Sequence, residues 1–367
     1  MLTTIIYAVS LENRSKIKMK KLTTRIIILL FGLLMLGTIS SYSQDLTLTP
    51  EETFEQFEET GATETELRFK AVELLLIDEV KQRVTQDNVN DRNDEGETLL
   101  LTGVISANII EYAFEEYMRI KGGDIREEES KQDGISGYVN TFTPAILQYM
   151  TTLVKPEREN IKQIIEYLIS MGAVPQLQDD YCKVLFEAVK YKENAEIAIQ
   201  LIDVTIENGN AEYLDIPEPP YNVTTIIGRA IKENNEKVAV YLIEKGVKVD
   251  EINDYTGRTL LHTATEKGQF EVADALIKSG KIDVNLSDNE EYTPLFIVID
   301  KFSRDRKQEY LEIAKSLIDN GADLETKFYG KTPYEDAVEF KVEEIAEYIK
   351  NKEDSEKTEM LEGVKNQ

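Results

Sequence analysis

The chain has 367 residues, and its 69 acidic residues against 42 basic ones give a formal charge of −27 at pH 7. This negative charge repels phosphate backbones and anionic lipid surfaces, which argues against a nucleic-acid-binding or membrane-surface protein. The single cysteine and the single histidine exclude an intrachain disulfide and any metal site that needs two histidines from one chain.

The first element along the chain has the pattern of a targeting segment. Basic residues from Lys16 to Arg25 precede a mostly apolar run, residues 26–39, and small residues follow as far as Ser43. This order is typical of a secretory signal peptide. A helix over the apolar run would span about 21 Å, less than the roughly 30 Å of a bilayer core, so a permanent anchor is the weaker alternative.

We therefore expect residues 1–43 to be a cleaved signal peptide, with Met19 as an alternative start, and the protein to be periplasmic or secreted from a bacterial cell. Without this segment, 36 basic and 68 acidic residues remain, a formal charge of −32. A basic protein partner is one explanation for this charge, and simple solubility is the other.

Residues 44–87 are predicted to be helical, with an apolar side that includes Leu67, Ala71 and Leu74. After residue 88 similar positions recur at steps of 34 to 45 residues. They are Thr98, Thr143, Lys183, Thr225, Thr259, Thr293 and Thr332. Such a period is typical of helical solenoids.

The clearest repeat begins at Thr259 and reads as two short helices. Leu260, Leu261 and Ala264 form one apolar stripe, and residues 272–277 carry a second at helical spacing. Thr259 can cap the first helix, and glycines at 268 and 280 suit the turns that follow each helix. Since one pair of helices cannot bury both stripes, successive pairs must stack.

The repeats resemble the ankyrin family on these residues. The Gly-Arg-Thr-Leu-Leu-His-Thr-Ala stretch at 257–264 is similar to the family's first-helix motif, as are Thr293-Pro294-Leu295 and Thr332-Pro333. The sequences Gly-Ala-Asp-Leu at 321–324 and Asp-Val-Asn at 283–285 are similar to the motif that ends each repeat.

The resemblance implies an all-α, ankyrin-type helical solenoid of stacked helix pairs with short hairpin loops. We predict a helical cap at residues 44–87 and an array of about six or seven repeats at 88–351. Insertions are predicted near 122–140, 210–221 and 302–309, and a charged flexible tail at 352–367.

No residue pattern predicts catalysis, a cofactor or a metal. His262 occupies the family's histidine position, where its ring is expected to bond backbone groups of the neighbouring turn. Cys182 is expected to be a small buried side chain. The segment 91–102 begins like a calcium loop, but Thr102 stands where the bidentate carboxylate is required, so a hairpin is favoured.

The resemblance also implies a partner-binding concave face, formed by hairpin tips and the exposed ends of first helices. The predicted contact residues are Tyr255, Thr256, Arg258, Glu266, Lys267, Asn289, Glu290, Tyr292, Asp300, Lys301, Phe328, Tyr329 and Lys331. Exposed aromatic side chains are typical anchors of protein interfaces. A role in packing the hairpins is an equally good reading of these aromatic residues.

The sequence thus predicts a non-enzymatic, monomeric scaffold that binds another protein. One alternative is an acidic immunity or inhibitor protein that neutralises a basic exported toxin or enzyme, since opposite charge would speed capture. A second is an enzyme with its site in the insertions, although no nucleophile, base and oxyanion donor occur together there.

Overall fold

The computed structural model describes residues 50–121, 144–175, 182–218 and 224–365. The predicted signal peptide and the insertion near 122–140 lie outside these ranges. The described part is all-α, as predicted, and its only extended pairings are isolated bridges. The chain divides after Val174 into two compact units.

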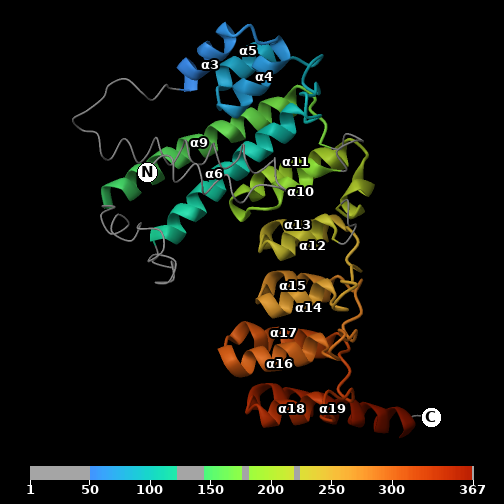
Figure 1. The fold of residues 1–367 in the computed structure, drawn as a ribbon. Coiled ribbons are helices and arrows are strands. Elements are labelled where there is room, and N and C mark those ends of the chain that lie inside the picture. Colours follow the sequence, from blue (N-terminus) through green and yellow to red (C-terminus); the bar gives the residue numbers. More distant parts are fainter. Residues whose placement is uncertain (1–49, 122–143, 176–181, 219–223, 366–367) are drawn as a thin grey trace. The chain divides into compact units, whose positions relative to one another are not determined.

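Residues 50–121 and 144–174, the described part of the first unit, contain five helices (Figure 1). They are α3 (Pro50–Glu59), α4 (Glu64–Glu73), α5 (Ile77–Arg83), α6 (Leu99–Lys121) and α9 (Pro144–Ser170). Helix α4 begins at a capping box in which Thr63 and Glu66 satisfy each other's backbone N–H groups. It packs against α6, while α5 packs against α9.

Helices α4 and α5 form a repeat-like pair that leads into the pair α6 and α9. Asn90 joins the two pairs, since its Nδ2 donates to the Gly172 carbonyl at 3.0 Å and its Oδ1 accepts from the Val174 N–H at 3.1 Å. The second unit contains the same link, from Asn285 to the Gly321 carbonyl (2.9 Å) and the Asp323 N–H (2.7 Å).

This shared link corrects the sequence-based division of the first unit. Thr98 and Thr143 were predicted to begin separate repeats, but α6 and α9 pack against each other as the two helices of one pair. This single pair extends over residues 99–170, close to two periods of the other repeats, so the spacing from Thr98 to Thr143 resembled that of two repeats. Thr143 itself lies outside the described residues.

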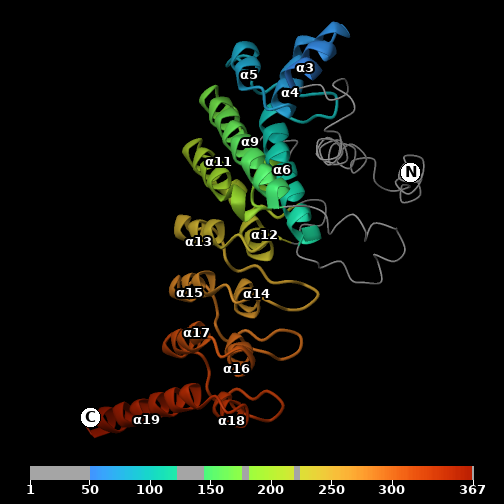
Figure 2. The ribbon, with the colours of Figure 1, turned by 90° about the vertical axis from the view of Figure 1, so that its left-hand side faces the viewer.

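The second unit is a stack of five helix pairs. Its helices are α10 (Lys183–Ala188), α11 (Ala195–Glu207), α12 (Ile226–Lys232), α13 (Glu236–Lys245), α14 (Leu260–Lys267), α15 (Phe270–Lys278), α16 (Pro294–Asp305), α17 (Gln308–Asp319), α18 (Pro333–Glu339) and α19 (Glu343–Lys365), with 3-10 turns η2 (Lys192–Asn194) and η3 (Ala211–Asp215). First helices pack on first helices and second helices on second helices (Figure 2).

The threonines that define the period begin the first helices from α12 onward. The Thr225, Thr259 and Thr332 side chains each accept a backbone N–H from the third residue of the helix, the role expected of an N-cap. Thr293 holds the same position without that bond, and Pro294 follows it at the first helical residue. The caps thus set the register in which the apolar stripes meet.

Two segments differ from the predicted boundaries. The insertion near 302–309 is largely helical, because α16 continues to Asp305 before Arg306 turns left-handed and α17 begins at Gln308. Helix α19 runs to Lys365, through the segment from 352 that was predicted as a flexible tail. That segment is rich in Glu and Lys, which are good helix formers, and has no proline.

Candidate interaction surface

The candidate surface lies in the second unit, on the side of α14, α16 and α18. Three hairpins, residues 253–258, 288–292 and 328–331, extend from this side, away from α15, α17 and α19 (Figure 2). We call these hairpins and the three helices the hairpin face. Nine of the thirteen residues predicted to contact a partner belong to the hairpins, Glu266 and Lys267 end α14, and Asp300 and Lys301 lie within α16.

The hairpin loops shorten by one residue from each repeat to the next. The closing N–H to O distances are 2.8 Å for Asn253 to Arg258, 2.8 Å for Asp288 to Tyr292 and 2.9 Å for Phe328 to Lys331. The enclosed loops therefore hold four, three and two residues. In the first two, the opening Asn253 or Asp288 side chain also accepts backbone N–H groups of its own loop.

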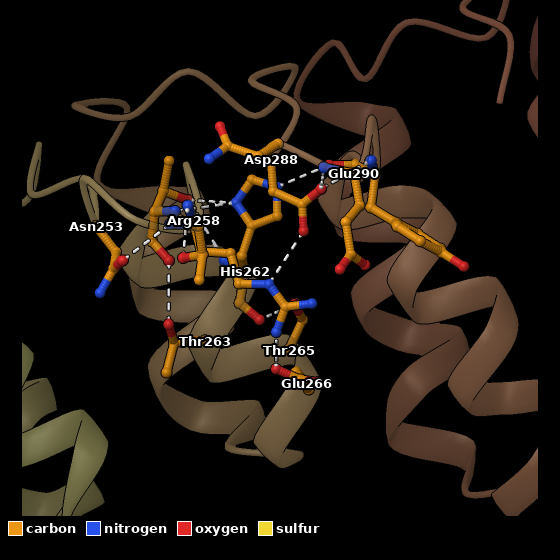
Figure 3. A network of polar contacts seen from close by, with 12 residues as sticks. Asn253, Arg258, His262, Thr263, Thr265, Glu266, Asp288 and Glu290 are labelled. Atoms are coloured by element: carbon orange, nitrogen blue, oxygen red, sulfur yellow. Dashed lines mark hydrogen bonds and ion pairs between the residues drawn. The ribbon is translucent and has the colours of Figure 1, made fainter.

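A polar junction joins the repeat of α14 to the repeat of α16 (Figure 3). Arg258 donates from Nε to Asp288 Oδ2 at 3.0 Å and forms a second ion pair with Glu266. The Asp288 side chain is buried and also accepts the Glu290 and Tyr292 N–H groups, at 2.9 and 3.1 Å. One carboxylate thus orders its own loop and anchors the preceding repeat.

His262 is also part of the polar junction, because its ring links Thr259 of one repeat to Tyr292 of the next. Its Nδ1 lies 3.2 Å from the Thr259 nitrogen and 2.7 Å from Thr259 Oγ1, and its Nε2 lies 3.0 Å from the Tyr292 carbonyl oxygen. A carbonyl only accepts, so the neutral ring carries its proton on Nε2. Burial lowers the His262 pKa. The predicted structural role of His262 is confirmed.

The first two hairpin tips are bound directly to each other. Asn289 donates from its backbone N–H to the Thr256 carbonyl at 2.8 Å and from Nδ2 to the Tyr255 carbonyl at 3.0 Å. Gly257 has a φ of +70°, and a Cβ there would lie 2.5 Å from Asn289 Oδ1. Glycine at 257 therefore permits the close approach of the two loops.

An aromatic junction joins the repeat of α16 to the repeat of α18. The Phe328 ring lies 4.0 Å from that of Tyr292, 5.4 Å from that of Phe296 and 4.5 Å from that of Tyr329, measured between centroids. Phe328 opens its hairpin at the position that Asn253 and Asp288 hold in the earlier ones. Apolar packing replaces the polar loop contacts at this junction.

The predicted contact residues differ in their availability to a partner. Tyr255 and Tyr329 are each 84% exposed, and Thr256, Lys267, Asn289 and Glu290 are exposed. Six others are half-buried: Arg258, Glu266, Tyr292, Asp300, Lys301 and Lys331. Phe328 is buried, which corrects its prediction as an exposed anchor, because the two-residue loop turns its ring inward onto Tyr292.

Several of these side chains also hold the repeats together. Arg258 and Lys331 form equivalent ion pairs, with Glu266 and Glu339, each from the hairpin base to the end of the first helix. Lys267 donates to the Lys232 carbonyl at 2.9 Å, in the preceding repeat. The tip residues themselves are the part of the surface that remains free for a partner.

The exposed tips are acidic. Asp254, Glu290 and Glu291 are exposed and form no ion pair with any residue that the structure describes.

Asp336, a buried carboxyl residue on α18, was not among the residues predicted from the sequence. Its position four residues after Thr332 was the available signal, since the equivalent residues in α14 and α16 are Thr263 and Ile297.

Other candidate chemistries receive no structural support. Cys182 is buried, and burial raises the pKa of its thiol to about 12, so it is not a ready nucleophile. Asp91 forms an ion pair with Arg68 at 2.7 Å, and Arg92 bridges to Thr98, which confirms the predicted hairpin. Across the described ranges, no three metal-ligating side chains converge.

Within those ranges every helix is too short or too polar to serve as a transmembrane span.

A family profile of ankyrin repeats, in three copies, matches residues 185–288 and 227–327. Residues 185–327 are therefore ankyrin repeats. Such repeats indicate a scaffold for protein–protein interaction and are typically non-enzymatic.

Two toxins of Latrodectus tredecimguttatus are similar to part of this chain. Alpha-latrocrustotoxin-Lt1a is 29% identical over 104 residues and alpha-latroinsectotoxin-Lt1a is 28% identical over 122 residues. The alignments cover 28% and 32% of this chain but only 7% and 8% of the toxins. The chain thus spans less than a tenth of the length of these relatives.

Proposed function

We propose that this protein is a non-enzymatic scaffold that acts outside the bacterial cytoplasm and binds a folded protein through the hairpin face. The observation that carries this proposal is the exposure of Tyr255 and Tyr329 at two hairpin tips, 84% each. Both residues are rigidly supported, Tyr255 by the Asn289 bond to its carbonyl and Tyr329 by the ring of Phe328. Pre-ordered aromatic side chains lose little entropy when a partner binds.

Export is supported by the order of basic, apolar and small residues in 1–43. The strong negative charge of the rest of the chain and its lack of paired cysteines agree with a binding protein whose stability comes from helix packing. Expression of the full chain, followed by fractionation and N-terminal sequencing, tests export. A cytoplasmic protein that retains residues 1–43 would contradict it.

The binding face is tested by affinity capture from envelope extract. Proteins retained by the wild type and lost in the double variant Tyr255→Ala and Tyr329→Ala would support the hairpin face. Tyr334→Ala is the matched control, since Tyr334 is a partly exposed tyrosine on α18 outside the tips. Capture that is unchanged in the double variant would contradict the proposed face.

A sharper form of the proposal is an acidic inhibitor of a basic exported protein. The unpaired tip carboxylates Asp254, Glu290 and Glu291 beside the tyrosines favour it, since cationic residues of a partner would meet both charge and aromatic rings. Association that slows markedly as salt increases from about 0.05 to 0.5 M would support charge steering. Salt-independent association would contradict this form and leave the scaffold proposal standing.

A further inference from the structure

One pair of positions recurs in the last three repeats. A cation directly before the N-cap threonine pairs with a carboxylate seven residues after it, as Arg258 with Glu266 and Lys331 with Glu339. The intervening repeat keeps the carboxylate, Asp300, but has Tyr292 at the position of the cation. Asp300 therefore lacks the partner that the repeat pattern supplies on either side.

Arg304 does not fully replace that missing cation. It pairs with Asp300 at 2.7 Å along the same helix, but its own side chain is largely exposed. Exposed ion pairs at this spacing contribute little and give way readily to a competitor. Asp300 thus remains open to a second cation.

Asp336 lies on the neighbouring helix α18 and is more unusual. The residue is only 7% exposed, and its carboxyl group forms no hydrogen bond or ion pair within the part of the chain that the structure describes. Burial raises the Asp336 pKa to about 6, with Glu339 and Asp300 also raising it and Lys331 opposing them. A buried, unpaired carboxyl group is strongly stabilised by an added cation.

Tyr292 supplies an aromatic surface beside these carboxyl groups. Burial raises the pKa of its half-buried phenol, and the negative charges of Asp300 and Asp336 raise it further. The Tyr292 ring packs on that of Phe328. An aromatic ring next to a carboxylate is a common setting for a cationic side chain, because the ring and the charge both attract it.

We propose that the hairpin face between α16 and α18 receives one arginine or lysine side chain of a protein partner, bound by Asp300 and Asp336 against the ring of Tyr292. This site rests on the proposed scaffold function and specifies the chemistry of the partner. A metal ion is a poorer fit, since the described residues place no group of three ligands there.

The site makes partner binding depend on pH. Asp336 must be ionised to hold the cation, so affinity falls as the pH decreases through its pKa of about 6. The other charged groups that act on it are Asp300 on α16, Glu339 on α18 and Lys331 at the hairpin base. Lys331 and Glu339 are already paired to each other.

The test uses the full chain with ¹³C-labelled aspartate side chains and N-acetyl-arginine amide as the probe. The expected result at pH 7.5 is a saturable shift of the Asp336 and Asp300 carboxyl signals and a lower apparent pKa of Asp336 in the presence of the probe. N-acetyl-citrulline amide, the neutral analogue, should cause no such shift.

Asp336→Asn should weaken binding of the probe at least about tenfold, the effect of losing a charged hydrogen bond. Glu309→Gln, which removes an exposed carboxylate from α17, is the matched control and should leave binding unchanged. The proposal is overturned if citrulline shifts the same signals, if Asp336→Asn binds equally well, or if only exposed carboxylates respond.

This result is separable from that of the capture experiment. Loss of the arginine site with intact tip-dependent capture would overturn the inference alone. Arginine binding in a protein whose capture ignores Tyr255 and Tyr329 would overturn only the proposed role of the tips.

Discussion

The two junctions on the hairpin face join adjacent repeats by different chemistry. At the polar junction, Arg258 pairs with Asp288, while Asp288 and His262 each bond backbone groups. At the aromatic junction, Phe328 packs among Tyr292, Phe296 and Tyr329. The longer loops leave room for polar side chains to bond backbone groups, whereas the two-residue loop turns an aromatic ring onto the preceding repeat.

The comparison shows that adjacent repeats of one helical stack can be joined by either polar or aromatic contacts, provided that each buried polar group has a hydrogen-bond partner. The polar joint depends on every member, since removal of one leaves another unpaired. The aromatic joint depends on shape and buried area. Substitutions at the two junctions should therefore differ in size and in their response to pH.

Phe328→Ala should have the largest effect. Deleting a buried phenylalanine leaves a cavity and destabilises by about 3 to 4 kcal/mol. Because the stack is nearly one-dimensional, α18 and α19 should exchange amide hydrogens faster while α12 to α15 stay protected. Hydrogen exchange measures this, and Tyr329→Ala, at an exposed position, should change little. Equal exchange in all helices would contradict a local joint.

Asp288→Ala should come next, at about 2 to 3 kcal/mol, since Arg258 and two backbone N–H groups lose their acceptor. Urea unfolding at pH 7 measures the loss. Because the Asp288 carboxylate is buried, 0.5 M salt should not reproduce the effect. Glu290→Ala, one of the exposed tip carboxylates, is the control and should change stability by less than about 0.5 kcal/mol.

Asp336→Asn should stabilise the free protein above pH 6 by up to about 3 kcal/mol, the free energy of a pKa shift of about two units. The folded-state pKa is raised, so this group's contribution to stability is full below its unfolded value and is lost as the pH rises through about 6. Unfolding from pH 4 to 8 should show that fall in the wild type only. A fall of equal size in both proteins would assign it elsewhere.

Residues 257 and 291 form a reciprocal pair of tests in the two polar loops. Glu291 has a φ of +68°, as Gly257 has +70°, so Glu291→Gly should stabilise by about 1 kcal/mol. Gly257→Ala should destabilise by more than that, because its Cβ would also meet Asn289. Thermal unfolding of both variants compares them. Effects of the same sign would contradict the argument from backbone conformation.

The smallest effect should be the pH dependence of stability that His262 causes, because burial lowers the pKa of this residue. Its contribution to stability is present above the unfolded pKa and is lost as the pH falls through the folded one, since Nδ1 then ceases to accept from Thr259. Lowering the pH thus reduces the stability contributed by His262, whereas it increases the stability contributed by Asp336. The His262 contribution is therefore best measured in the Asp336→Asn variant. His262→Gln in that background should flatten the remaining pH dependence below about pH 6.5.

The sequence predicted the helix pairs well from Thr225 onward, because Thr259, Thr293 and Thr332 act locally as N-caps and the apolar stripes have the helical period. It failed at Thr143, because the single pair of α6 and α9 extends over residues 99–170, a length close to two periods. A period alone cannot distinguish one enlarged repeat from two ordinary ones.

The surface was less predictable for a different reason. Phe328 and Tyr329 are neighbours in one hairpin, but Phe328, which opens it, is buried against Tyr292, whereas Tyr329 in the loop is 84% exposed. This difference depends on contacts with the preceding repeat, which the spacing of the residues does not reveal. Asp336 was missed because α18 packs against α16, which is distant in sequence.

Asn285 has a consequence for how such a chain diversifies. Its amide contacts only main-chain atoms, the Gly321 carbonyl and the Asp323 N–H, and Asn90 does the same in the other unit. Because these hydrogen bonds involve only main-chain atoms of the neighbouring loop, side chains of that loop can change without loss of the bonds between repeats. New recognition properties can therefore arise in this protein by mutation of loop residues, while the spacing between its repeats stays constant.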